Sequence, residues 1–145
     1  MKNLIIAFVA IVFSITLSAQ EWQTDFEIAK QISSEKNRPI VLVFQGSDWC
    51  APCIKLDREI WSSKEFKAYA KEHFVMLQAD FPRKKANTLT DDQQEKNNLL
   101  AEKYNKQGYF PFVVVLDKDG KVLGEAGYEK TTPATYIEKL ESFVK

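Results

Sequence analysis

The sequence predicts an α/β domain with a mixed central sheet and helices on both faces. Two uninterrupted apolar runs, residues 39–45 and 111–117, alternate with amphipathic helical segments, as is typical of strands buried on both faces. Each β-α-β crossover requires a parallel pair of strands. The Asp-Gly pair at residues 119–120 predicts a tight hairpin, which makes the last two strands antiparallel.

The first 19 residues differ from the rest of the chain. One lysine precedes an uncharged run from Leu4 to Leu17, and the small residues Ser18 and Ala19 follow. A run of about 14 residues fits a signal-peptide core and is shorter than the ~20 residues that cross a bilayer. We therefore expect a signal peptide at residues 1–19 and a single domain at residues 20–145, in the periplasm or secreted. An uncleaved anchor is the alternative.

The first half of the expected domain contains two capping boxes, each of which predicts a helix start. Thr24 with Glu27, and Ser62 with Glu65, place a hydroxyl group three residues before an acid. The first of these helices ends before Asn37. The other predicted elements of this half are a strand at residues 39–45, a helical stretch at about residues 50–60 and a strand at residues 74–80.

The second half begins with a polar segment, residues 81–90, that we expect to be a loop. Thr90 and Gln93 form a third capping box, for a helix to about Gln107 with Gly108 at its left-handed cap. A hairpin of two strands and a last helix complete the predicted order α-β-α-β-α-β-β-α. The strands are residues 111–117 and 121–128, and the helix is capped by Thr132 with Pro133 at its first position.

The charge balance limits the kinds of partner. The chain has 20 cationic and 20 anionic side chains, which gives a formal net charge of zero. Nucleic acids select strongly basic surfaces, so we expect no nucleic-acid partner.

The two cysteines of the chain stand two residues apart in the stretch SDWCAPC, residues 47–53. A structural zinc site needs about four ligands, and only Cys50, Cys53 and the lone His73 are available, so we expect no metal. His73 is interpreted as a solvated residue at a helix end. A structural disulfide would close a very short loop and stabilise the fold by only roughly 2 kcal/mol.

A redox couple explains the placement of the two cysteines as well as their spacing. Cys50 follows a buried strand at a helix N-terminus, where free N–H groups and the helix dipole stabilise a thiolate. Cys53 lies one turn later, in position to resolve a mixed disulfide at Cys50. Pro52 occupies the first turn, where its missing N–H has no cost. We predict an exposed attacking thiol at Cys50, a buried resolving thiol at Cys53, and no cofactor other than their disulfide.

The run WCAPC after VLVF, with a proline that opens the third strand, resembles the thioredoxin superfamily over about residues 25–144. The chain is most similar to secreted bacterial thioredoxin-like proteins and to the C-terminal domain of DsbD. The resemblance implies a thioredoxin fold and a cis peptide bond at Pro111, beside the cysteines. It also implies that the backbone of Phe110 is free to pair with an extended substrate.

Three tryptophans and two carboxylates lie near the cysteines in the sequence or elsewhere in the predicted helices and strands, and two interpretations are open for some of them. Trp49 either shields the cysteines and offers substrates an apolar surface, or is a core residue, whereas Trp22 and Trp61 are interpreted as packing residues. Asp48 is either a helix-start carboxylate or a solvated one. Asp57, four residues after Cys53 on one helix face, is either a proton-transfer helper or a solvated residue.

The chain departs from the thioredoxin pattern at one position. Many thioredoxins carry a buried carboxylate six residues before the first cysteine, which relays a proton to the resolving thiol. Phe44 stands there in this chain, and it cannot move a proton. The resemblance therefore leaves open which group takes up the proton of Cys53.

Together these patterns predict a thiol–disulfide oxidoreductase that reduces disulfides in exported proteins. The Ala-Pro pair between the cysteines resembles the Gly-Pro of reducing thioredoxins more than the Pro-His of the oxidant DsbA. We expect disulfide-containing protein substrates and a membrane thiol–disulfide electron donor, because no nicotinamide or flavin motif occurs in the chain. The alternatives are an oxidase or isomerase of secreted proteins, and a redox-inactive thioredoxin-fold binding module.

Overall fold

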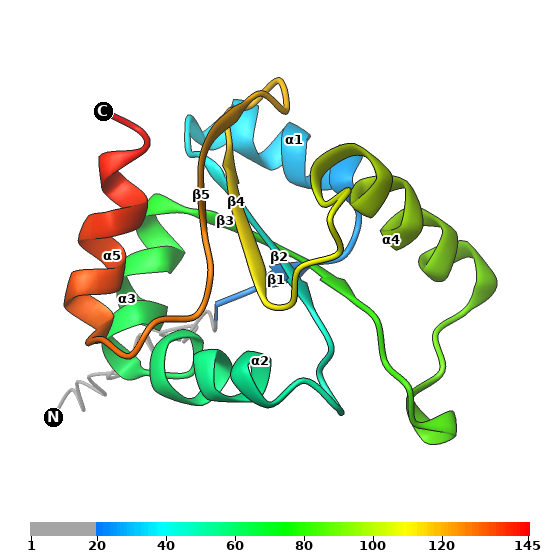
Figure 1. Ribbon diagram of the computed structural model, residues 1–145. Coiled ribbons are helices and arrows are strands. Elements are labelled where there is room, and N and C mark those ends of the chain that lie inside the picture. Colours follow the sequence, from blue (N-terminus) through cyan, green and yellow to red (C-terminus); the bar gives the residue numbers. More distant parts are fainter. Residues whose placement is uncertain (1–19) are drawn as a thin grey trace, which may run out of the picture.

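The computed structural model describes residues 20–145, and the predicted signal peptide at residues 1–19 lies outside the described residues. A five-stranded mixed sheet forms the centre of the domain, with the strand order β1-β3-β2-β4-β5 (Figure 1). The strands are β1 (Trp22–Gln23), β2 (Ile40–Gln45), β3 (Val75–Asp80), β4 (Phe112–Leu116) and β5 (Val122–Ala126).

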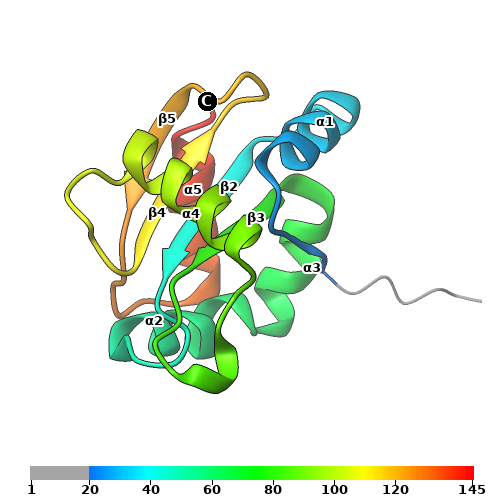
Figure 2. The ribbon, with the colours of Figure 1, turned by 90° about the vertical axis from the view of Figure 1, so that its right-hand side faces the viewer.

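Helices cover both faces of this sheet, as Figures 1 and 2 show. The helical elements are α1 (Phe26–Lys36), α2 (Ala51–Leu56), the π-helical turn η1 (Asp57–Trp61), α3 (Lys64–His73), the 3-10 turn η2 (Lys85–Asn87), α4 (Asp91–Tyr104) and α5 (Pro133–Ser142). None of these helices, within residues 20–145, is both long enough and apolar enough to cross a membrane. The predicted fold class is confirmed.

The central strand β2 fixes the topology. It pairs with β3 in parallel along its whole length and with β4 antiparallel from Ile40↔Leu116 to Phe44↔Phe112. β4 and β5 are antiparallel and are joined by the predicted turn, in which Gly120 has a φ of +83°. The parallel pair and the hairpin are confirmed. The two-residue strand β1, parallel to β3, was not expected, because so short a segment shows no periodicity.

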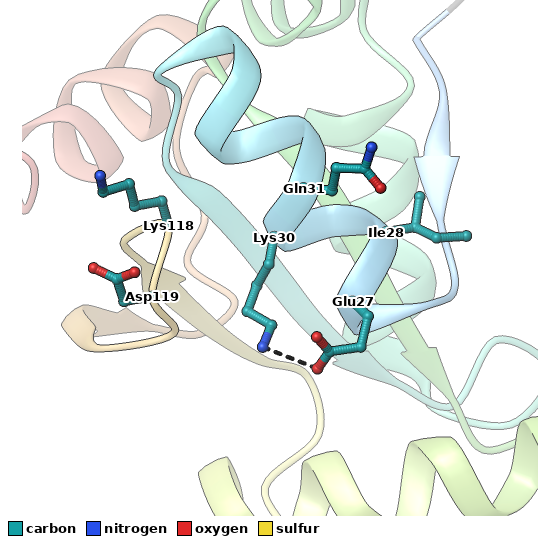
Figure 3. Close-up of a pocket in the computed structure, with 6 residues that line it drawn as sticks. All are labelled: Glu27, Ile28, Lys30, Gln31, Lys118 and Asp119. Carbon is teal, nitrogen blue, oxygen red and sulfur yellow. Dashed lines mark ion pairs between the residues drawn. The ribbon is translucent and has the colours of Figure 1, made fainter.

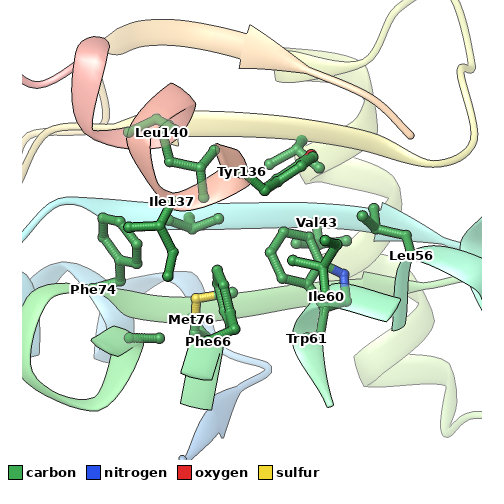
Figure 4. Packing of buried hydrophobic residues seen from close by; sticks show 14 residues of the cluster. Val43, Leu56, Ile60, Trp61, Phe66, Phe74, Met76, Tyr136, Ile137 and Leu140 are labelled. Carbon is green, nitrogen blue, oxygen red and sulfur yellow. The ribbon is translucent and has the colours of Figure 1, made fainter. Parts of the chain in front are cut away.

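Alternate residues of β2 enter two separate cores. Val41 and Val43 face α2, η1, α3 and α5, whereas Ile40, Leu42 and Phe44 face α1 and α4. Trp61 lies in the first core against the rings of Phe66 and Tyr136 (Figure 4). Burial of each such side chain contributes about 1.5–3 kcal/mol to folding. Trp61 is therefore a packing residue, as predicted, and Trp22 packs on the edge of the same core.

Two predicted helix caps are wrong by one residue. The N-cap of α1 is Asp25 rather than Thr24, because the Asp25 carboxylate accepts the backbone N–H groups of Glu27 and Ile28. The N-cap of α3 is Ser63 rather than Ser62. The π-helical turn adds one residue before α3 starts, since the Ser62 N–H still bonds to the carbonyl of Asp57.

The Thr90 cap of α4 is confirmed, but this helix ends at Tyr104, earlier than predicted. The buried Asn105 side chain accepts the backbone N–H of Tyr109 and donates to its carbonyl. These bonds close a turn from Asn105 to Tyr109 in place of further helix. Gly108, with a φ of +68°, serves that turn and is not the helix cap that we expected.

Candidate active site

Cys50 and Cys53 lie where the carboxyl end of β2 passes into α2. The connecting residues form a turn in which the Cys50 N–H bonds to the Gly46 carbonyl at 2.9 Å. The Trp49 indole lies against Gly46 so closely that a Cβ at Gly46 would be 2.2 Å from the ring. This position therefore requires glycine, which the sequence analysis did not identify.

The two cysteines form a disulfide across the first turn of α2, with their Cα atoms 5.2 Å apart. Cys50 is the N-cap of this helix, and its Sγ accepts the Cys53 backbone N–H at 3.3 Å. Pro52 lies exposed in the first turn, as predicted. The helix start thus presents an N–H group to the sulfur of Cys50, where that N–H would stabilise a thiolate.

Both cysteines are buried in the disulfide form, and the expectation of an exposed Cys50 thiol and a buried Cys53 thiol in the reduced protein stays a prediction. The two residues expose 4% and 3% of their surfaces, so burial does not distinguish them. The two sulfurs are bonded to each other, so each covers part of the other's surface. Trp49 is the residue that precedes Cys50. The two sulfurs differ in their positions relative to the helix start, because only Cys50 is the N-cap.

Three aromatic rings form an apolar surface beside the disulfide. The rings of Trp49 and Phe81 each pack edge-on against the ring of Phe110, with centroids 5.5 Å apart. Trp49 is partly exposed and thus is not a core residue. The bond between Phe110 and Pro111 is cis, and no hydrogen bond within residues 20–145 uses the Phe110 backbone. The Phe110 backbone groups are therefore available to a peptide beside this surface.

Asp48 fastens the loop of residues 81–90 to the cysteine turn. Its carboxylate accepts the backbone N–H groups of Arg83 and Lys84 at 2.9 and 3.0 Å, and the Asn87 side-chain amide at 2.9 Å. These bonds, led by that from Arg83, lower the pKa of Asp48 from its ordinary value. Asp48 is thus neither a helix-start nor a merely solvated carboxylate, because its partners belong to a loop distant in sequence.

Two further contacts hold the same loop in place, and a third joins the cysteine turn to the end of β3. The Trp49 indole N–H donates to the Phe81 carbonyl at 2.7 Å, and the Arg83 guanidinium lies 3.6 Å from the centroid of the Trp49 ring. The backbone N–H of Ser47 bonds to the Asp80 carboxylate. Figures 1 and 2 both show this segment, after β3, beside the turn that precedes α2. Only the tertiary structure brings these residues together.

A cavity of about 350 Å³ reaches Cys53 from the side of β2 and α2. It is lined by Trp22, Gln45, Ser47, Cys53, Ile54, Asp57 and Gln78. Asp57 is the only carboxylic acid in this lining, and it also accepts a hydrogen bond from the Ser62 hydroxyl. The prediction that Asp57 shares a face with Cys53 is confirmed, while its role in proton transfer remains a prediction.

The position that sequence comparison assigns to a relay carboxylate does not face Cys53. Phe44 packs in the core on the side of α1 and α4, where its ring stacks on Phe112 with centroids 6.3 Å apart. The next residue, Gln45, lines the Cys53 cavity and donates to the side chain of Gln78 at 3.1 Å. Successive residues of a strand point to opposite faces of the sheet. Gln45 and not Phe44 therefore lies on the same side of the sheet as Cys53.

Cavity size alone does not identify this site. A larger cavity of about 540 Å³, shown in Figure 3, lies between α1 and the β4–β5 turn and contains the Glu27–Lys30 ion pair. It contains no cysteine and lies at the opposite end of the sheet from Cys50, because β4 is antiparallel to β2.

No cluster of three or more potential metal ligands occurs in residues 20–145. His73 is exposed at the end of α3, as predicted, and its ring stacks on Tyr69 with centroids 4.0 Å apart.

Comparisons with known proteins agree with this geometry. A family model described as thioredoxin-like matches residues 21–118. The disulfide bond reductase DsbH of Chlamydia pneumoniae is 39% identical over 125 residues, which are 86% of this chain and 73% of that protein. A solved structure of a DsbH oxidoreductase matches with a TM-score of 0.80 and 35% identity, over 94% of this chain and 92% of the other. The oxidised C-terminal domain of DsbD from Neisseria meningitidis shares the fold, with 24% identity and a TM-score of 0.51, over 79% and 88% of the two chains.

We predict that the amide signals of Arg83 and Lys84 report the titration of Asp48 in an NMR pH series. Because its pKa in the folded protein is lowered, the carboxylate anchors the loop fully above its ordinary pKa of 3.8. The anchoring is lost as the pH falls through the lower folded-state value. The shared midpoint of the two amides should thus lie below 3.8.

Asp48→Asn should abolish this titration at the amides of both Arg83 and Lys84, because it removes the carboxylate that accepts their N–H groups. A midpoint at or above 3.8 in the unmodified protein would contradict the three-donor arrangement.

Proposed function

The chain belongs to the thioredoxin-like family and is a thiol–disulfide oxidoreductase, and on that premise we propose that it reduces disulfides in exported proteins. One observation carries the proposal. A Cys50–Cys53 pair caps helix α2 beside an exposed aromatic surface and a free stretch of backbone at Phe110. The direction of the reaction is supported by the likeness to a disulfide bond reductase over most of both chains.

The proposed reaction proceeds in two exchanges. In the first, the Cys50 thiolate attacks a sulfur of the substrate disulfide, forming a mixed disulfide and releasing one substrate thiolate. In the second, the Cys53 thiolate attacks Cys50 Sγ, restoring the Cys50–Cys53 disulfide and releasing the other substrate thiolate. Two electrons pass from the dithiol to the substrate, and the two thiol protons end on the substrate thiols.

The start of helix α2 supports Cys50 as the thiol that attacks first. Its Sγ already accepts a backbone N–H in the disulfide form, and that bond becomes charge-assisted when the sulfur is a thiolate. Cys53 lies inside the first turn and lacks such a donor among the described residues. The thiolate is the nucleophile in thiol chemistry, so the helix start favours Cys50 as the attacking group.

The aromatic surface and the Phe110 backbone support binding of an extended peptide. A peptide strand that pairs with free backbone groups gains main-chain hydrogen bonds, while apolar contacts align it over the sulfur. The rings of Trp49 and Phe110, which pack against each other, would supply those apolar contacts to the peptide. We propose that disulfide-containing segments of exported proteins bind in this manner, in an extended form.

The proposal includes a location and an electron source outside this chain. A signal peptide at residues 1–19 would deliver the domain of residues 20–145 to the periplasm, or secrete it. Reduced Cys50 and Cys53 must be regenerated there, which calls for a thiol–disulfide donor in the membrane. The shared fold with a DsbD domain is consistent with exchange between two domains of this kind.

We propose that Asp57 takes up the proton of Cys53 during the second exchange. Both residues line the same cavity, whose volume of about 350 Å³ has room for several water molecules. Among the cavity-lining residues only Asp57 combines a carboxylate with exposure to solvent. A water-bridged route from Cys53 Sγ through Asp57 to bulk solvent would replace the relay carboxylate of other thioredoxins.

We predict a reduction potential for the Cys50–Cys53 couple nearer to the thioredoxin value of about −270 mV than to the DsbA value of about −120 mV. The difference of ~150 mV corresponds to about 7 kcal/mol for two electrons, which a glutathione titration resolves readily. A potential above about −180 mV would favour the alternative of an oxidase or isomerase.

Single cysteine variants should separate the two thiols. Cys53→Ser cannot perform the second exchange, so it should accumulate mixed disulfides with substrates, visible by non-reducing electrophoresis. Cys50→Ser should trap none. Alkylation of the reduced protein near pH 7 should modify Cys50 first. Preferential trapping by the Cys50→Ser variant would reverse the two roles, and trapping by neither would favour a redox-inactive binding module.

Asp57→Asn should slow the release of reduced substrate at pH 7 and have a smaller effect at pH 9, where hydroxide can accept the proton. The first exchange at Cys50 should change little, so stopped-flow measurements of the two steps should diverge. Asp119→Asn, in the turn at the opposite end of the sheet, is the matched control and should leave both steps unchanged. Normal release by Asp57→Asn at both pH values would assign Asp57 to the solvated surface.

A further inference from the structure

We propose that Arg83, Lys84 and Lys85, named here the basic segment, recognise acidic residues that flank the disulfide of the substrate. The inference deepens the proposed function and rests on it, since it names the substrate class of the same site. It depends on three observations: the exposure of these cations, the hydrogen bonds that hold the backbone of Arg83 and Lys84, and the contact of Arg83 with Trp49, which precedes Cys50.

The basic segment is a local concentration of charge in a chain with none overall. Its three consecutive cations are all exposed, while the whole sequence balances 20 cationic with 20 anionic side chains. No ion pair within residues 20–145 engages any of the three. Their charges are thus available to a partner.

Three acidic residues around the basic segment, Asp48, Asp80 and Asp92, have other partners. Asp48 accepts two backbone N–H groups and an amide, so its hydrogen bonds hold the segment without ion-pairing with its side chains. Asp80 accepts the N–H of Ser47, and Asp92 pairs with Lys96. An acidic partner would therefore meet cations that the fold has left unpaired.

The attachment of the backbone gives the basic segment a defined place. Two hydrogen bonds to Asp48 fix the N–H groups of Arg83 and Lys84, and the short helical turn of Lys85–Asn87 follows at once. Segments held in this way lose less conformational entropy on binding than free loops do, which favours specific recognition.

The basic segment also touches the redox site itself. Arg83 stacks on Trp49, and Trp49 precedes Cys50 and contacts Phe110. A peptide that lies along Phe110 with its disulfide at Cys50 would have neighbouring residues within reach of these cations. The aromatic surface would hold its apolar residues and the basic segment its carboxylates, which together define an acidic polypeptide as the partner.

The test uses two disulfide peptides of equal length that differ only in whether glutamates or glutamines flank the disulfide. The second-order rate constants for their reduction by the reduced protein, measured in a single turnover, give a preference ratio, acidic over neutral, at about 0.05 M and about 0.5 M salt. We expect a ratio of about ten at low salt, because charge steering raises association rates by ~10-fold or more. The ratio should approach one at high salt.

The double variant Lys84→Gln with Lys85→Gln should reduce the low-salt ratio to near one. The charge-reversed variant Lys84→Glu with Lys85→Glu should invert it. The matched control is Lys118→Gln with Lys121→Gln, which removes the same charge from the β4–β5 turn at the far end of the sheet. This control should retain the ratio of the unmodified protein, and an equal loss in the control would overturn the proposal by showing an effect of net charge alone.

The remaining outcomes separate this inference from the proposed function. Equal reduction of the two peptides at low salt would overturn the recognition of acidic residues and leave the reductase intact. Failure to reduce either peptide would overturn the reductase itself. Binding to vesicles of anionic phospholipid that needs Lys84 and Lys85, together with a ratio of one, would assign the basic segment to a membrane surface instead.

Discussion

Every part of the redox site depends on the position of the carboxyl end of β2, which is hydrogen-bonded on both edges and buried on both faces. The backbone groups of such a strand have no access to water. If the strand lost its hydrogen bonds to β3 and β4, its N–H and C=O groups would be buried without partners. This pairing fixes the position of the strand, and the turn that follows its last residue therefore places Cys50 at the carboxyl end of β2. The neighbouring strand β4 delivers Phe110 and Pro111 to the same end of the sheet, because it runs antiparallel to β2.

From this fixed end the site is assembled by contacts of different strength. The Trp49 ring is held by its hydrogen bond to Phe81, by Phe110, and by the close approach that Gly46 permits. Two polar contacts lie around these rings. The Asp48 carboxylate holds the loop of residues 81–90, and the backbone N–H of Cys53 at the helix start donates to Cys50 Sγ. The packing decides where the sulfur is, and we propose that the electrostatics influence how it reacts and which substrates approach it.

The sequence predicted much of this arrangement because its signals are local. The apolar runs, the Asp-Gly turn and the CAPC spacing each act within a few residues, so strands, hairpin and redox pair could be predicted in order. Helix starts were off by one residue at Asp25 and Ser63, because neighbouring polar residues compete for the cap and the π-helical turn shifts the frame. The strand at Trp22 was missed because two residues carry no pattern.

The sequence by itself determined the order of the helices and of the four longer strands, and it identified Cys50 and Cys53 as a redox pair, because neighbouring residues set both. Only the tertiary structure decided that Gln45 rather than Phe44 faces Cys53, that Asp57 shares its cavity, and that Asp48 binds a loop some 35 residues away. Those relations depend on which face of a strand meets which helix and on how β3 lies beside β2. Long-range packing sets them, since pairing across the sheet brings together segments that no local pattern connects.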